Sequence, residues 1–147
     1  MPSLSPSKEA CDAIVDALNA STDFETQFTA CYVEFPTEDL GDGETLSVEV
    51  VHEDEEQLQE MLQADYTRHT IVVQVTGRCR PGDDEATEEY KKLAADIKTS
   101  LDQWDSSDGR VSVWYVADEP VSDADKQALR EMNLFRRNVK LTVEVAP

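Results

Sequence analysis

Basic residues are scarce in this sequence, and most of them lie in its second half. Lys8 is the only Lys or Arg before Arg68, and the 147 residues carry 32 acidic against 13 basic side chains, a formal net charge of −19. The resulting field disfavours long-range attraction to DNA, RNA or anionic lipid. It argues against a general nucleic-acid or membrane binder and indicates either charged protein partners or a solvated acidic surface.

Cysteine and long apolar runs are also scarce. The three cysteines, Cys11, Cys31 and Cys79, are odd in number and contain no Cys-x-x-Cys pair, so neither a disulfide framework nor a zinc site is indicated. No apolar run reaches 18 residues, and the first residues lack the basic and apolar regions of a signal peptide. We therefore expect a soluble protein that is not exported by a standard signal.

Catalytic motifs are missing as well. The sequence has no Gly-x-Ser-x-Gly elbow, no phosphate-binding or dinucleotide glycine motif and no calcium-loop spacing, and its two histidines have no companion motif. Cys79 lies between Arg78 and Arg80, which could lower its pKa, but a loop thiol is the simpler interpretation. We expect a protein that is not an enzyme and that uses no cofactor and no metal.

Three segments have the apolar spacing of helices. Residues 83–104 form the clearest one, residues 3–21 form another, and residues 122–132 begin with Ser122 and Asp125 at the spacing of a capping box. The candidate N-caps are Ser5 or Ser7, Asp83 or Asp84, and Ser122. Residues 53–65 have an apolar stripe about one turn long, so we expect a short helix or an exposed loop there.

Alternating apolar residues predict five strands. They are residues 28–36, 46–50, 69–78, 111–117 and 133–145. We expect the first two to form a hairpin with a long loop. In the last strand, Val139, Leu141, Val143 and Val145 face one side, and Lys140, Thr142 and Glu144 face the other.

These elements predict an α+β fold in a single domain, residues 1–147. We expect a mixed sheet of four or five strands, with the two main amphipathic helices packed on one face. The strands offer one apolar face and one face of Thr, Ser, Gln and Glu. The polar face should therefore be wet or lie against a polar partner.

A basic cluster begins the last strand, where Arg136, Arg137 and Lys140 follow Phe135. Such a cluster could stack on bases or bind phosphates, but the patch is small and the surrounding field repels DNA. Pairing with acids of a neighbouring subunit fits the composition better. The four residues are therefore our candidate subunit interface, and pairing within the chain remains open.

The order of elements, with "CDAIVDALNAS", "FTACYVEFPTEDL", "HTIVVQVTGR", "EYKKLAADIKTSL" and "NLFRRNVKLTVEV", resembles the tail-terminator, or minor tail, proteins of long-tailed phages and prophages. The resemblance covers nearly the whole chain. It implies an α+β subunit that forms a hexameric ring, ends tail-tube polymerisation and presents a surface for head-tail joining. The implied partners are further copies of the chain, the tail-tube protein and a head-completion or connector protein.

The same resemblance implies a place in the tail-neck region of a virion, with assembly in the host cytoplasm. DNA would pass through the ring without specific binding, and an acidic lining would keep it from sticking. Glu34, Glu49 and Glu144, on the polar face of the sheet, are the candidate lumen-facing acids.

Other interpretations remain open. A neighbouring neck or connector protein would share much of the pattern. An acidic DNA mimic, whose carboxylates copy phosphate spacing and inhibit a DNA-binding enzyme, would explain the charge of −19 directly but not the basic cluster. A small metal-dependent hydrolase has no ligand motif and ranks last.

Overall fold

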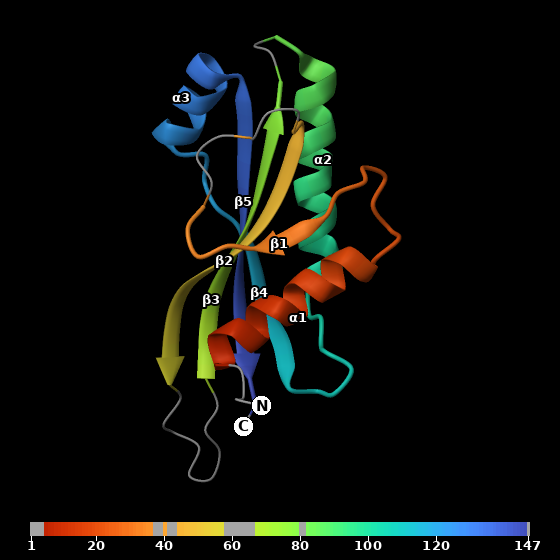
Figure 1. The fold of residues 1–147 in the computed structure, drawn as a ribbon, viewed down its shortest axis with the longest axis vertical. Coiled ribbons are helices and arrows are strands. Elements are labelled where there is room, and N and C mark those ends of the chain that lie inside the picture. Colours follow the sequence, from red (N-terminus) through yellow and green to blue (C-terminus); the bar gives the residue numbers. More distant parts are fainter. Residues whose placement is uncertain (1–4, 37–39, 41–43, 58–66, 80–81, 147) are drawn as a thin grey trace.

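The computed structural model describes residues 5–36, 40, 44–57, 67–79 and 82–146. Within these residues, three helices and five strands follow one another (Figure 1). In order they are α1 (Pro6–Ala20), β1 (Ala30–Tyr32), β2 (Leu46–Gln57), β3 (Thr67–Arg78), α2 (Asp84–Leu101), β4 (Val111–Asp118), α3 (Asp123–Met132) and β5 (Leu134–Val145). The predicted α+β class is confirmed.

Each helix begins at a residue whose side chain satisfies a free backbone N–H. Ser5 caps α1 and accepts from the N–H of Lys8, and Asp83 caps α2 and accepts from that of Ala86. At α3, the Ser122 and Asp125 side chains each accept from the other's backbone N–H, which completes the predicted capping box. Asn133, in the left-handed conformation, ends α3 and turns the chain into β5.

The sheet has the strand order β1-β2-β3-β5-β4. β1 runs parallel to β2, and all other neighbours are antiparallel. The last strand of the chain is therefore inserted between β3 and β4. β5 pairs with β3 from Leu134 to Val145 but with β4 only from Val139 to Val145, so its basic start at Arg136 and Arg137 has a strand neighbour on one side only.

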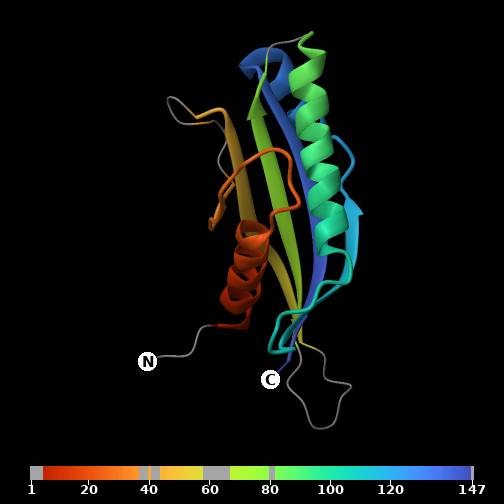
Figure 2. The same cartoon turned by 90° about the vertical axis from the view of Figure 1, so that its right-hand side faces the viewer.

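Both main helices cover one face of this sheet, α1 toward one end and α2 toward the other (Figure 2). The core between them is a continuous apolar cluster that joins Ile14 of α1 and Ile97 of α2 to the valines of all four long strands. β5 contributes Val139, Leu141, Val143 and Val145 to it, all at most 2% exposed. The predicted alternation of this strand is confirmed.

The predicted hairpin of the first two strands is wrong. β1 has only three paired residues, in parallel register with Val48–Val50, and the true antiparallel neighbour of β2 is β3. The Asn19 side chain holds β1 at the end of α1, because it accepts from the N–H of Ala30 at 2.7 Å and donates to the Ala30 carbonyl at 3.0 Å. This contact between distant residues fixes the strand direction and leaves no signal in the strand's own sequence.

The short helix or loop expected over residues 53–65 is also wrong where it can be checked. β2 continues through this segment to Gln57, which pairs with Thr67. A register shift between His52 and Asp54 absorbs one residue. Backbone pairing with β3 thus prevails over a weak helical stripe. Residues 58–65 of that prediction lie outside the described residues.

The face of the sheet opposite the helices is polar, as expected, but its centre is not wet. Glu49, Gln74 and Thr76 lie there and are 3%, 7% and 2% exposed. At one end of this face, α3 closes over Leu134 in a small apolar cluster with Ala128 and Leu40. The chain itself therefore covers part of the surface that we expected to meet solvent or a partner.

Candidate interaction surface

The four predicted interface residues of β5 lie on different sides of the sheet. Arg137 is opposite Val75 and Phe135 is opposite Gly77, on the helix-covered face. Arg136, opposite Thr76, and Lys140, opposite Val72, lie on the other face. Because neighbouring residues of a strand alternate between faces, the adjacent arginines cannot form one patch. Their role in subunit contacts stays a prediction.

Phe135 is part of a small second core. Its ring lies 5.8 Å from that of Tyr90, and both are less than 10% exposed. The Tyr90 hydroxyl donates to the Arg78 carbonyl at 2.9 Å, and a Cβ on Gly77 would overlap the Tyr90 ring. The Arg137 guanidinium lies 5.3 Å from the Phe135 ring centre, a cation–π distance. Phe135 is thus a structural residue with little surface to offer a partner.

Lys140 is already paired within the chain. Its Nζ lies 3.4 Å from Glu53 and 3.8 Å from Glu119. Glu119 also accepts from the Asn138 side chain at 3.2 Å. These contacts connect β2, β5 and the end of β4 across the polar face, so the ammonium group has a role in the subunit itself.

The three predicted lumen acids occupy different environments. Glu34 is exposed and lies beyond the end of β1. Glu49 is buried in the polar face, and Glu144 on the same face accepts a hydrogen bond from Arg68 at 2.9 Å. Only Glu34 therefore presents an open carboxylate in the isolated chain. The assignment of the three residues to a channel stays a prediction.

Several cations without an ion-pair partner, which the sequence did not reveal, lie in α3 and near it. Most described cations have a carboxylate partner within 4 Å. Within the described part of the chain, no such ion pair is found for Arg78, Lys126, Arg130 or Arg137. All four lie in α3 or near the adjoining ends of β3 and β5. Cations without a carboxylate partner thus gather at one end of an acidic molecule, although Arg137 contacts the Phe135 ring and Arg78 donates to the Glu44 carbonyl.

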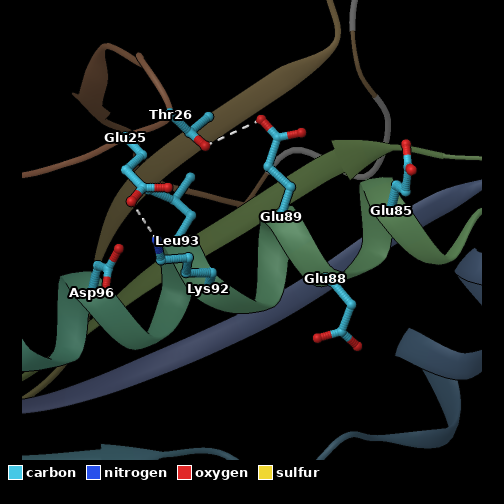
Figure 3. Close-up of a pocket in the computed structure, with 8 residues that line it drawn as sticks. All are labelled: Glu25, Thr26, Glu85, Glu88, Glu89, Lys92, Leu93 and Asp96. Carbon is cyan, nitrogen blue, oxygen red and sulfur yellow. Dashed lines mark hydrogen bonds and ion pairs between the residues drawn. The ribbon is translucent and has the colours of Figure 1, made fainter.

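An acidic groove lies between α2 and the segment before β1 (Figure 3). Its volume is about 380 Å³, with the buried Leu93 among its lining residues. The charged lining residues are five acids and one lysine: Glu25, Glu85, Glu88, Glu89, Asp96 and Lys92. Hydrogen bonding to Glu25, at 2.6 Å, raises the pKa of Lys92 and keeps it charged. The acids outnumber it, so the groove carries a strong negative potential.

Exposed apolar side chains mark two further places. Trp114 and Tyr115, 62% and 64% exposed, lie at a register shift in the edge strand β4. Val121 and Met132, 38% and 41% exposed, flank α3 on either side. Sequence reasoning missed both places, because alternation alone does not show which strand is an edge or which end of a short helix is uncovered.

Two histidines, on β2 and near the start of β3, form a hydrogen-bonded pair. His52 Nε2 lies 3.0 Å from His69 Nδ1, and the Thr67 hydroxyl lies 2.8 Å from His69 Nε2. Burial lowers the pKa of His69, whose side chain is inaccessible to solvent, and the neighbouring Glu55 opposes this shift. The pair is satisfied with neutral rings, so its geometry supports a structural role better than a catalytic one.

The cysteines give no sign of reactivity in this fold. Burial raises the pKa of Cys79, which packs against Tyr90 and Phe135, and raises that of Cys11 to about 12. Cys31 is exposed as a residue, but partial desolvation of its sulfur and the nearby Glu49 carboxylate raise its pKa as well. Raised pKa values reduce the thiolate fraction, so an activated nucleophile is not supported.

The described residues contain neither a metal-site geometry nor a membrane-spanning helix. No three His, Cys, Asp or Glu side chains converge in the way a metal ion would need. Among the helices of the described chain, none is both long and apolar enough to span a bilayer.

Comparisons with known proteins place the fold. No protein-family model matches the sequence, and no curated protein matches it. A chain in the virion of a native gene transfer agent particle superposes with a TM-score of 0.56 at 16% identity, over 98% of both chains. The sheath/tube terminator of an extracellular contractile injection system in its extended state gives a TM-score of 0.45 at 13% identity, over 100% of this chain and 58% of that one. The chain therefore shares its whole fold with a component of a gene transfer agent virion.

Proposed function

We propose that this chain is a structural protein of a phage-like tail, which caps the tail tube as a ring, ends its polymerisation and forms a surface for head-tail joining. The observation that carries the proposal is the match in fold to a chain of a gene transfer agent virion over 98% of both chains. The resemblance of the sequence to tail-terminator proteins supports it independently. The role makes and breaks no covalent bond.

The surfaces of the subunit fit an assembly role better than a catalytic one. Acids without an ion-pair partner lie on α2, and cations without one lie around α3, within the part of the chain that the structure describes. Exposed apolar residues lie at the ends of α3, on the edge strand β4 and, as Phe35, beyond the end of β1. Complementary charge at two separate places favours head-to-tail association, which closes into a ring when the rotation allows.

The proposed partners are further copies of the chain, the tail-tube protein and a head-completion or connector protein, at the tail-neck of a virion. DNA would pass through the ring without being bound. A net charge of −19 supports this passage, because a channel through such a ring repels phosphates. In the assembled ring, Glu34, Glu49 and Glu144 remain the predicted lining.

Native mass measurement and negative-stain images of the pure protein, alone and mixed with the tail-tube subunits of the same particle, test the proposal. We expect rings on one end of each tube. A chain that stays monomeric in both samples and never binds a tube end would contradict it. Competition with DNA for a DNA-binding enzyme would instead support the DNA-mimic alternative, which the charge of −19 favours.

A further inference from the structure

We infer that the outer face of α3 docks onto the acidic groove of α2 in a second copy of this chain. The inference rests on the proposed ring and specifies which two surfaces form its repeating contact. The interface residues shift accordingly, from the basic start of β5 to α3.

The outer face of α3 is suited to bind an acidic partner. The helix packs through Ala128, which is 4% exposed. At 100° per residue, Lys126 and Arg130 both lie on the side opposite Ala128, and both are exposed. Neither has a carboxylate partner among the described residues. Asp123, in the first turn, shares this face, so the charge that remains is positive.

One exposed apolar residue lies at each end of α3, and at 100° per residue Met132 is nearer the Ala128 side than the side of the two cations. Val121 and Met132 are 38% and 41% exposed, one before α3 and one at its last turn. Exposed apolar side chains beside charged groups are typical of a protein-protein interface, where the apolar contact supplies affinity and the charges supply orientation.

The groove on α2 provides the complementary surface. Glu85 and Glu89 are four residues apart on α2, as Lys126 and Arg130 are on α3, so both pairs are separated by about 6 Å along their helices. Within the described residues, Glu85 and Asp96 have no ion-pair partner, and Glu89 accepts only from Thr26 at 3.1 Å. A helix that presents two cations at this spacing can therefore pair with both carboxylates of the first two turns.

The two surfaces lie on opposite sides of the same end of the molecule. α3 and α2 flank the upper ends of β3 and β5 in Figure 1, and the groove faces away from α3, toward the segment that carries Glu25 and Thr26. One copy cannot bring its own α3 into its own groove. A contact between unlike surfaces on opposite sides repeats from copy to copy, which is the geometry of a ring.

Charge reversal on each side tests the docking. The first variant carries Lys126→Glu and Arg130→Glu, and the second carries Glu85→Lys and Glu89→Lys. In a sample of either variant alone, like charges meet in every contact between copies. We therefore expect the Kd for self-association of each variant to rise by at least about 30-fold. An equal mixture can alternate the two variants, and both kinds of contact then become complementary. We expect rings with even numbers of subunits to return in the mixture.

Native mass spectrometry and sedimentation of the wild type, both variants and the mixture provide the readout, with circular dichroism as the control for folding. A third variant, Ser107→Glu in the loop between α2 and β4, adds an acid away from both surfaces and should assemble like the wild type. The docking would be overturned if both reversed variants still form rings like those of the wild type. It would also be overturned if the equal mixture of the two variants forms no rings. If the reversed α3 keeps the ring and loses only the tube subunits, α3 binds that protein instead. A wild type that forms no ring, even with tube subunits, would contradict both the docking and the proposed function.

Discussion

The two faces of the sheet are buried in different ways. On the helix-covered face, Val73 and Leu141 pack among apolar side chains and are inaccessible to solvent. On the opposite face, Gln74 and Thr76 are nearly as buried but are polar and hydrogen-bonded to each other at 3.4 Å. Burial on the first face therefore reflects the hydrophobic effect. On the second face, the chain covers polar side chains whose hydrogen bonds are satisfied.

The largest effect should come from the helix side of the core. Ile97→Ala on α2 removes a side chain with no solvent exposure, and we expect a loss of roughly 2–5 kcal/mol in the free energy of unfolding. Chemical denaturation measures it. Lys91→Ala on the exposed side of the same helix loses only a surface pair with Glu88 and should cost less than about 1 kcal/mol. Equal losses in the two variants would contradict the assignment of this face to the core.

Two neighbouring residues of β3, one on each face of the sheet, allow the two faces to be compared directly, because Val and Thr have nearly the same shape. Val75→Thr places a hydroxyl in the apolar core and should cost about 1–3 kcal/mol of unfolding free energy. Thr76→Val on the other face leaves the buried Gln74 amide without the one long hydrogen bond that it donates to Thr76, so it should cost about 1 kcal/mol, the low end for an orphaned buried donor. The denaturant midpoints of the two variants measure which substitution costs more unfolding free energy. A larger loss for Thr76→Val would show that the polar face, and not the apolar one, dominates stability.

The cap of α3 tests how firmly the proposed docking element is held. Ser122→Ala removes one half of the capping box and should cost about 1 kcal/mol. Hydrogen exchange of the amides in α3 should rise, while that in α2 should stay unchanged. Unchanged exchange in α3 would mean that its contacts through Ala128 and Leu134 hold it without the cap.

The histidine pair gives the most specific effect, because it depends on pH. The folded pKa of His69 is lowered below its ordinary value, so the unfolded chain binds the proton more readily. The stability from neutral His69 is complete above the unfolded pKa, near 6.5, and is lost as the pH falls below that value. Each pH unit costs at most about 1.4 kcal/mol.

We therefore expect the wild type to lose more unfolding free energy than His69→Gln between pH 7 and pH 5. Chemical denaturation at both pH values measures the difference, and an NMR titration of the His69 ring in the wild type gives its pKa directly. A ring that titrates above its ordinary pKa would contradict the burial argument.

Local patterns predicted most of the fold. The two main helices, the capping box at Ser122 and the alternation of β5 follow from neighbouring residues alone, and the structure confirms them. The direction of β1 and the strand over residues 53–57 could not be predicted in the same way. The position of β1 depends on hydrogen bonds of the Asn19 side chain to Ala30, eleven residues further along the chain. The strand over residues 53–57 depends on pairing with β3.

The interaction surface was harder to predict than the fold. The basic residues at the start of β5 are adjacent in sequence, but the alternation of a strand separates them in space, and Phe135 is buried against Tyr90. Lys126 and Arg130 gave no signal in the sequence, because their importance depends on which other cations have partners. Pairing is a property of the folded chain, so only the structure distinguishes a free cation from a paired one.

The proposal that this chain ends tail-tube polymerisation can be tested directly by the lengths of the tubes. Tubes are assembled with increasing amounts of the chain, and their length distribution is measured. If the chain terminates tubes, a higher ratio of chain to tube subunit should shorten the mean tube, with a ring on one end of each tube in negative-stain images. A distribution that does not change with the ratio, from a chain that folds normally, would contradict the account.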